Sequence, residues 1–248
     1  MRNVCLKIQY DGTTLHGWQR QKDAMTVQQL LEDAVLTLTG EDVHIIGCGR
    51  TDAGVHALEY VCNFMTDCSI PDASFPEAIN TKIPVCIRVL EAKTVDDAFH
   101  AQFDVVKKRY IYKIQTNKIP NVFLSAYTWH FPHKLDIEKM QAAAKYFLGE
   151  HNFEAFCASG ATVKSFVRTI YDLTVSADEN VITIDVCGNG FLYNMVRIIA
   201  GTLVYVGNGK IEPDAIKEII DSRDRTLGGI TAPAHGLYMA GTYYGKEL

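Results

Sequence analysis

Apolar side chains recur at two different spacings along the first part of the chain, and these spacings predict both strands and helices. Residues 4–10 form a mainly apolar run that ends at the turn pair Asp11-Gly12, which is typical of a strand. From Thr26 to Gly40 the apolar positions repeat at steps of three and one, which predicts an amphipathic helix between these two capping residues. Further strands are expected at 43–47, 60–65 and 85–92, and a second helix at 71–82. The resulting order, β-α-β-β-α-β, predicts a ferredoxin-like half in residues 1–104.

Residues 105–248 show a comparable succession of elements without repeating the sequence of the first half. Strands are expected at 109–116, 166–176, 181–186 and 237–243, and helices at 137–148, 194–206 and 213–222. The polar residues 177–180 between two of these strands are typical of a hairpin. The sequence therefore predicts an α+β protein with two α/β halves, 1–104 and 105–248, and mainly antiparallel sheets.

The composition is that of an ordinary globular protein and excludes a disordered or polybasic one. Hydrophobic residues make up 48% of the 248 positions and charged residues 21%, and the formal net charge is −5. Residues 1–104 carry 8 basic and 15 acidic side chains, and residues 105–248 carry 16 and 14, so the two halves differ in sign at −7 and +2. A nucleic-acid ligand would need a local basic patch. The candidates are Lys107-Lys108-Arg109, Lys164 with Arg168, and Arg20 with Lys22.

Cysteine usage and the apolar stretches predict a cytoplasmic protein without membrane contact. The cysteines are odd in number, at seven, and contain no C-x-x-C pair, so reduced and mostly buried thiols are expected. Residues 1–7 lack the hydrophobic stretch of a signal peptide. The longest apolar stretch, 190–207, is interrupted by Asn194, Arg197 and Gly201, which argues against a membrane span.

Residues 47–57 place an Arg, a Thr, an Asp and a His between glycines, in a loop that joins two predicted strands. Glycines let such a backbone approach a ligand closely, so Arg50 and Asp52 are candidate functional residues. A capped turn in which Asp52 bonds its own backbone is the alternative. The chain carries no G-x-S-x-G, P-loop, G-x-G-x-x-G or H-E-x-x-H motif, and His130 and His133 are expected in a surface turn rather than a metal site.

The loop Gly49-Arg50-Thr51-Asp52-Ala53-Gly54-Val55-His56-Ala57 resembles the signature loop of the tRNA pseudouridine synthase A (TruA) family. Further matching motifs are Tyr10-Asp11-Gly12, Gly17-Trp18-Gln19-Arg20-Gln21, Phe99-His100-Ala101, Lys108-Arg109-Tyr110, Met195-Val196-Arg197, Asp224-Arg225-Thr226 and Gly236-Leu237. Each motif is weak by itself, but together they cover nearly the whole chain in the family's order and spacing. The resemblance implies a pseudouridine synthase core of two ferredoxin-like (RRM-like) halves with a central RNA cleft.

This resemblance implies an isomerase that converts uridine to pseudouridine at positions 38, 39 and 40 in the anticodon stem-loop of tRNA. The reaction breaks the bond from N1 to C1′, turns the base over and joins C5 to C1′, so neither a cofactor nor a metal is implied. By resemblance Asp52 is the catalytic nucleophile or base. Attack on C1′, attack on C6 and removal of the C2′ proton remain open for this residue. The expected partners are tRNA and, in a homodimer, a second copy of the chain.

The resemblance also assigns four substrate-binding residues. Tyr110 is expected to stack under the flipped uracil, although Tyr110 and Tyr112 would equally share one face of a strand as core residues. Arg50 is expected to help flip or replace the target nucleotide. Leu237 is expected to line the uridine pocket, although a strand leucine is ordinarily a core residue.

The fourth assigned residue, Arg197, is the only charged residue in the stretch 188–209. Burying an unpaired guanidinium is costly, so a carboxylate partner is expected, and the resemblance makes Asp52 that partner. The alternative is an arginine at a helix edge whose charged end reaches solvent.

Two other functions compete with the isomerase. A non-catalytic RNA-binding protein on the same fold is the first, because ferredoxin-like sheets commonly bind RNA. The joint presence of Asp52, Arg197 and Tyr110 argues against it. The second is a glycoside hydrolase, which also cleaves at an anomeric carbon but normally needs two carboxylates. No second carboxylate accompanies Asp52 at a readable spacing.

Overall fold

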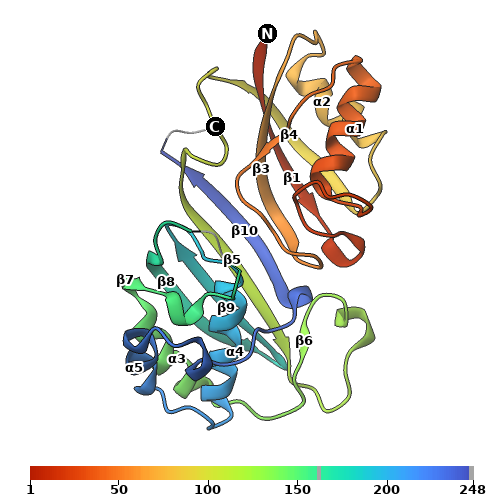
Figure 1. Ribbon diagram of the computed structural model, residues 1–248. Helices are drawn as coiled ribbons and strands as arrows, with labels where there is room; N and C mark the ends of the chain where they lie inside the picture. Colours follow the sequence, from red (N-terminus) through yellow and green to blue (C-terminus); the bar gives the residue numbers. More distant parts are fainter. Residues whose placement is uncertain (161–162, 246–248) are drawn as a thin grey trace. The chain divides into compact units, whose positions relative to one another are not determined.

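The computed structural model describes residues 1–160 and 163–245, and it divides the chain into two compact units (Figure 1). Unit 1 comprises Met1–Val106 and the chain from Tyr238 onward, and unit 2 comprises Lys107–Leu237. Both units combine helices with mainly antiparallel strands, which confirms the predicted α+β class. The sequence predicts that residues 105–248 form one half. The structure instead groups the chain from Tyr238 onward with unit 1, because its strand pairs with a strand of that unit.

The elements of unit 1 follow the predicted order along the chain. They are β1 (Arg2–Tyr10), α1 (Val27–Thr39), β2 (Ile46–Gly47), β3 (His56–Thr66), α2 (Phe75–Asn80), β4 (Ile87–Val95) and β10 (Leu237–Tyr244), with the 3₁₀ turns η1 (Gly12–Thr14) and η2 (Asp72–Ser74). Strand β1 lies between β4 and β3 and is antiparallel to both. Strand β3 also pairs with β2, antiparallel, and with β10, in parallel.

Helix α1 begins and ends at the residues that the sequence predicts. The Thr26 hydroxyl accepts a hydrogen bond from the Gln29 N–H (3.4 Å), and Gly40 ends the helix with a φ of 76°. The apolar face of α1 is buried, and the fully buried side chains of the unit include Leu6, Ile8, Leu31, Tyr60, Phe64 and Phe75. The core therefore lies between the helices and the sheet, as the alternation of apolar positions indicates.

The strand predicted at 43–47 is reduced to the two residues of β2. The reason lies in Gln28 and Glu32, two buried polar side chains of α1. The Gln28 amide donates to the Ile45 carbonyl (3.0 Å), and the Glu32 carboxylate accepts from the Ile45 N–H (3.1 Å). Both backbone groups of Ile45 are thus satisfied by a helix, so this residue has no need of a strand partner.

The helix predicted at 71–82 consists of the 3₁₀ turn η2 followed by the short helix α2. Pro76 has no N–H and is tolerated only in the first turn of a helix, which sets the start of α2 close to Phe75. Asp72 does not cap α2. Its carboxylate accepts from the Arg2 guanidinium and from the Thr94 N–H, both at 2.6 Å, and so ties η2 to the sheet.

Unit 2 has an antiparallel sheet in the order β5-β9-β8-β7, and β6 lies parallel beside β5. Its elements are β5 (Val105–Gln115), β6 (Trp129–His130), α3 (Ile137–Ala144), β7 (Gly149–Asn152), β8 (Val167–Asp178), β9 (Val181–Gly188), α4 (Met195–Gly207) and α5 (Ala215–Ser222), with the 3₁₀ turns η3 (Val122–Leu124), η4 (Lys145–Phe147), η5 (Glu154–Phe156), η6 (Arg225–Leu227) and η7 (Ala234–Gly236). The predicted hairpin between β8 and β9 is confirmed. Helix α4 is almost entirely buried, as its continuous apolar sequence predicts.

Candidate active site

Asp52 and Arg50 lie on the loop 48–55 of unit 1, between β2 and β3. Asp52 is half-buried, and Arg50 is exposed. The Val55 N–H donates to the Asp52 carbonyl (3.2 Å), and Gly54 has a φ of 80°. Residues 52–55 therefore form a tight turn whose third position needs glycine, and this turn holds Asp52 by its main chain.

A second segment, residues 12–18, packs its backbone against both flanks of Asp52. The Trp18 N–H donates to the Thr51 carbonyl (3.2 Å), and the Gly54 N–H donates to a carbonyl of the same segment (3.2 Å). The residues on either side of the carboxylate are thus fixed by backbone hydrogen bonds. Such preorganisation is what a positioned catalytic group requires.

Glycine occurs where the two segments come closest. A Cβ atom on Gly17, whose φ is 80°, would lie 2.2 Å from the Thr51 carbonyl oxygen. A Cβ on Gly12 would lie 2.1 Å from the Val55 carbonyl oxygen. Any side chain at these positions would push the loop 48–55 away. Both glycines belong to motifs that the sequence displays, but their role becomes visible only in the structure.

Three aromatic side chains, Tyr10, Trp18 and Tyr60, support the loop 48–55. The Tyr10 hydroxyl lies 2.9 Å from the Thr51 hydroxyl, and the Tyr60 hydroxyl donates to the Gly49 carbonyl. Tyr60 in turn stacks on Trp18, with ring centroids 4.4 Å apart. Burial raises the pKa of Tyr60 well above its ordinary value, so its hydroxyl stays a hydrogen-bond donor. The sequence prediction did not assign these supports. Tyr10 and Trp18 lie in glycine-containing motifs, which is a signal that could have found them, whereas nothing in the sequence marks Tyr60.

His56 belongs to the signature motif and has a supporting position. Its Nδ1 accepts a hydrogen bond from the Gly12 N–H (3.0 Å) and lies 3.2 Å from an Asp11 carboxylate oxygen. The imidazole is buried and stacks on Tyr238 of β10, with ring centroids 4.9 Å apart. His56 therefore connects β3 with β10 and with the turn that follows β1, next to the loop that carries Asp52.

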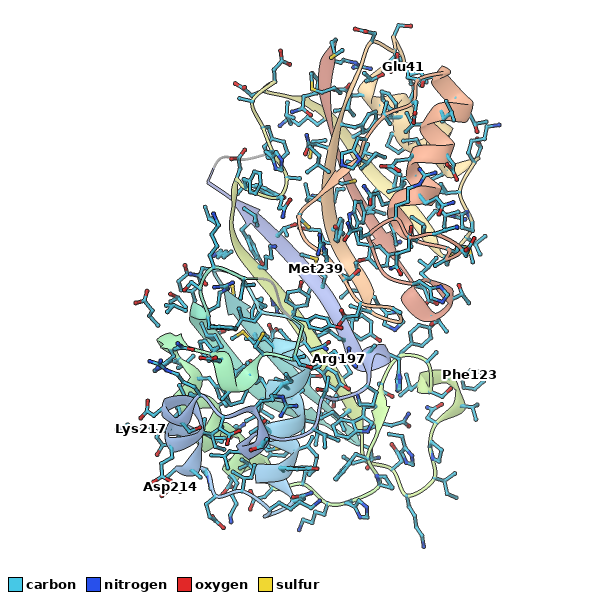
Figure 2. The ribbon with its side chains drawn as sticks, viewed as in Figure 1. Glu41, Phe123, Arg197, Asp214, Lys217 and Met239 are labelled. Carbon is cyan, nitrogen blue, oxygen red and sulfur yellow. The ribbon has the colours of Figure 1, made fainter. Side chains whose placement is uncertain are left out.

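Arg197 lies on α4 in unit 2 (Figure 2). Its Nε donates to the Ala232 carbonyl (2.7 Å), and its Nη1 donates to the Asn194 side-chain oxygen (2.8 Å). The guanidinium is partly buried. Burial raises the pKa of the Tyr112 phenol, and the positive charge of Arg197 opposes this rise. The Tyr112 hydroxyl donates to the Pro233 carbonyl (2.7 Å), so Arg197 and Tyr112 bind adjacent residues of one loop. Pairing of Arg197 with Asp52 stays a prediction.

That loop, residues 228–236, is fastened to α4 by a close contact between two backbones. The Gly229 N–H donates to the Thr202 hydroxyl (2.8 Å). A Cβ on Gly229 would lie 2.5 Å from the carbonyl carbon of Gly201. The loop therefore approaches α4 as closely as only glycine permits, and it leads directly into Leu237.

Tyr110 and Leu237 are both buried in unit 2, at 8% and 6% exposure. Tyr110 shares a face of β5 with Tyr112, as the spacing predicts, and its ring meets the edge of Phe191 at 5.2 Å. The predicted site residues are therefore divided, with Arg50 and Asp52 on one loop of unit 1 and Tyr110, Arg197 and Leu237 in unit 2. The structure joins Arg197 and Leu237 through the loop 228–236.

Several basic residues that the sequence offered as RNA contacts have partners within their own unit. The Arg20 guanidinium donates to Glu32 (2.8 Å), and Arg109 binds Asp185 with two of its nitrogens. Arg168 donates to the backbone carbonyls of Ser165 and Val167, at the start of β8. These partners come from elements distant in sequence or from the local backbone, so composition alone does not reveal them.

The part of the chain that the structure describes holds no group of three or more His, Cys, Asp or Glu side chains that could bind a metal ion. All seven cysteines are thiols outside any disulfide, and burial raises the pKa of the Cys5 thiol to about 12. Within residues 1–160 and 163–245 no helix is both long and apolar enough to span a membrane.

Comparison with known proteins agrees with the motifs around Asp52. A family model described as tRNA pseudouridine synthase matches residues 7–104 and 143–244. Three proteins named tRNA pseudouridine synthase A are similar to this chain. The protein of Acetivibrio thermocellus is 51% identical to it, that of Thermoanaerobacter pseudethanolicus 50% and that of Clostridium kluyveri 46%. Each of these matches covers 98% of this chain and 100% of the relative. The chain therefore belongs to the tRNA pseudouridine synthase A family.

Proposed function

We propose that this protein isomerises uridine to pseudouridine in the anticodon stem-loop of tRNA, at positions 38, 39 and 40. The bond between N1 and C1′ breaks, the base turns over, and a bond forms between C5 and C1′. N1 gains a proton and C5 loses one, so the reaction has no net redox change. The full-length match to tRNA pseudouridine synthases carries the proposal. The fixed position of Asp52 in unit 1 supports it.

Asp52 is the proposed nucleophile or base. Its neighbours Thr51 and Gly54 are hydrogen-bonded to the segment 12–18, and Tyr10 holds the Thr51 side chain. A carboxylate on so constrained a loop can be presented to the target nucleoside without reorganisation, which lowers the entropic part of the barrier. In unit 2, the proposed substrate-binding residues are Tyr110, Arg197 and Leu237, and in unit 1, Arg50.

The activity is tested directly with tRNA transcripts that carry tritium at C5 of uridine. Isomerisation releases the tritium to water, because C5 exchanges its hydrogen for the bond to C1′. Binding alone releases none, and hydrolysis of the glycosidic bond yields free uracil. Transcripts with each of the three uridines replaced in turn show which positions react. Release of free uracil, or no release at all, would contradict the proposal.

Tyr110→Phe is expected to bind tRNA normally, because the stacking ring is kept. It is expected to lose much of its turnover, because we assign the hydroxyl a part in proton movement. Tyr110→Ala is expected to bind more weakly as well, since stacking on a base is worth about 1–3 kcal/mol. Truncating this buried ring also removes its contact with Phe191, so the melting temperature is measured for both variants. Wild-type turnover in both variants would remove Tyr110 from the site.

We further propose that both halves predicted from the sequence, 1–104 and 105–248, are ferredoxin-like. In support, the second half repeats the order of the first along the chain: strand β5, helix α3, the antiparallel strands β8 and β9, helix α4 and strand β10.

A homodimer in the cytoplasm is the proposed state of the protein. Cysteines that form no disulfide and are largely buried are consistent with that compartment, and sedimentation measures the oligomeric state.

A further inference from the structure

An exposed apolar surface in unit 2 lies on the loop that connects β5 to β6, residues 116–128. Three of its side chains, Ile119, Val122 and Phe123, are exposed by 81%, 73% and 84%. Phe123 lies on the 3₁₀ turn η3 at the outer end of this loop (Figure 2). Apolar side chains gathered in this way on a surface commonly mark a binding site. Neither the proposed chemistry nor the site residues above use this loop.

The loop is held in place by polar contacts and is not merely an irregular connection. The fully buried Gln115 side chain donates to the Thr128 hydroxyl (2.8 Å) and accepts from the Asn121 N–H (2.8 Å), so one amide binds both limbs of the loop. The Asn121 side chain caps η3 by accepting from the Phe123 N–H (3.0 Å). The structure thus fixes the backbone while leaving the Phe123 ring in solvent.

Charge along the chain segment that contains this loop favours a polyanion as its partner, although the β8–β9 turn that accepts hydrogen bonds from Thr116 carries Asp178 and Glu179. The stretch 105–135 contains no Asp or Glu and six Lys or Arg, in a chain whose net charge is −5. Arg109 is paired with Asp185, whereas Lys118 on the loop and Lys134 just after β6 are exposed. Pairing of this surface with a second copy of itself across a twofold axis would bring like charges together.

We propose that the loop 116–128 is an RNA-contact surface on which Phe123 stacks against an unpaired base of tRNA. Sequence-tolerant stacking on exposed aromatic rings, next to basic side chains, is a general mode of single-stranded RNA recognition. Ile119 and Val122 add exposed apolar side chains to the same loop, and Lys118 adds an exposed positive charge that suits a phosphate backbone. The inference rests on the proposed function, because that function supplies tRNA as the ligand.

The test measures the dissociation constant of the full-length protein for a fluorescently labelled tRNA transcript at fixed salt. Phe123→Ala is expected to weaken binding by about 5- to 150-fold, the range that corresponds to the loss of one stacked base. Phe123→Trp keeps a stacking ring and is expected to bind as the wild type does. Phe123→Leu keeps an apolar side chain without a ring and is expected to bind weakly.

Two valines of similar exposure provide a test position, Val122 on the loop, and a matched control, Val85. Val122→Ser is expected to weaken tRNA binding, whereas Val85→Ser, at a position of unit 1 that is 85% exposed, is not. Lys118→Gln is expected to lower the salt dependence of binding by about one counterion. Unchanged tRNA affinity in Phe123→Ala overturns the proposal. A second result also overturns the proposal. If the sedimentation coefficient changes in Phe123→Ala but not in Phe123→Leu, and tRNA affinity stays the same, the loop is a protein interface.

Failure of this inference and failure of the proposed function give different results. If the wild type releases tritium from tRNA and Phe123→Ala binds tRNA normally, the loop is not an RNA contact and the isomerase stands. If the wild type releases no tritium but Phe123→Ala loses tRNA affinity, the contact surface stands and the isomerase is wrong.

Discussion

Asp52→Ala is expected to reduce pseudouridine formation below detection, a loss of about 10,000-fold or more, while the protein still folds and binds tRNA. General acid or base catalysis by itself contributes about 100- to 10,000-fold, and a covalent step adds to this. The fold is expected to survive because the loop is held by backbone bonds and by Thr51, which the substitution leaves in place. Tritium release measures the activity, and anisotropy with labelled tRNA measures the binding.

The matched control for this experiment is Asp42→Ala, which removes an exposed carboxylate from the same unit. It is expected to keep wild-type turnover and melting temperature. Asp52→Asn is expected to behave as Asp52→Ala does, because an amide neither attacks carbon nor accepts the proton. Substantial turnover by Asp52→Ala would refute the assignment of Asp52. A large loss of melting temperature would show that its side chain supports the loop itself.

Arg197→Met is expected to lower turnover by about 100-fold or more. The guanidinium is held by the Ala232 carbonyl and the Asn194 side chain, so it is a fixed positive charge inside unit 2. Its removal leaves these acceptors without a donor and, if the predicted pairing is right, leaves the Asp52 carboxylate without its counter-charge. Removing one partner of a buried pair typically costs about 3–5 kcal/mol, which corresponds to at least 100-fold.

Two variants separate this role from packing. Arg197→Lys keeps the charge but cannot present a planar fork, so it is expected to recover only part of the rate. Arg88→Met removes a guanidinium that also donates to backbone carbonyls, those of Pro84 and Ile87, but lies outside the proposed site. It is expected to keep full turnover. A normal rate in Arg197→Met with an unchanged melting temperature would exclude Arg197 from the site.

The elements that the sequence predicted best are those whose ends are determined locally. Helix α1 starts at Thr26 and stops at Gly40 because a cap and a left-handed glycine act within one turn of the backbone. The predicted strand at 43–47 was wrong in its length, since Gln28 and Glu32 take up the backbone of Ile45 from a helix earlier in the chain. The pattern of apolar and polar positions along the chain cannot predict such a contact between two segments.

The same limit applies to the site. The motif glycines and Asp52 are visible in the sequence because a tight turn has strict local requirements. The support of that turn by Tyr10, Trp18 and Tyr60 is not, because it depends on which strands become neighbours. Likewise Arg109 resembles an RNA contact in a basic run, until pairing of β5 with β9 brings Asp185 to it.

The ribosome synthesises β10 from Tyr238 onward only after the whole of unit 2, although these residues pair with β3 of unit 1. Until then the nascent chain leaves His56 without the Tyr238 ring on which it stacks, and β3 keeps an open edge at His56 and Ala57. The sequence of unit 1 is therefore complete only after unit 2 has been synthesised. Maturation of the loop that carries Asp52 is tied to a strand encoded far downstream, so a chain cut short before Tyr238 contains the carboxylate but not its full support.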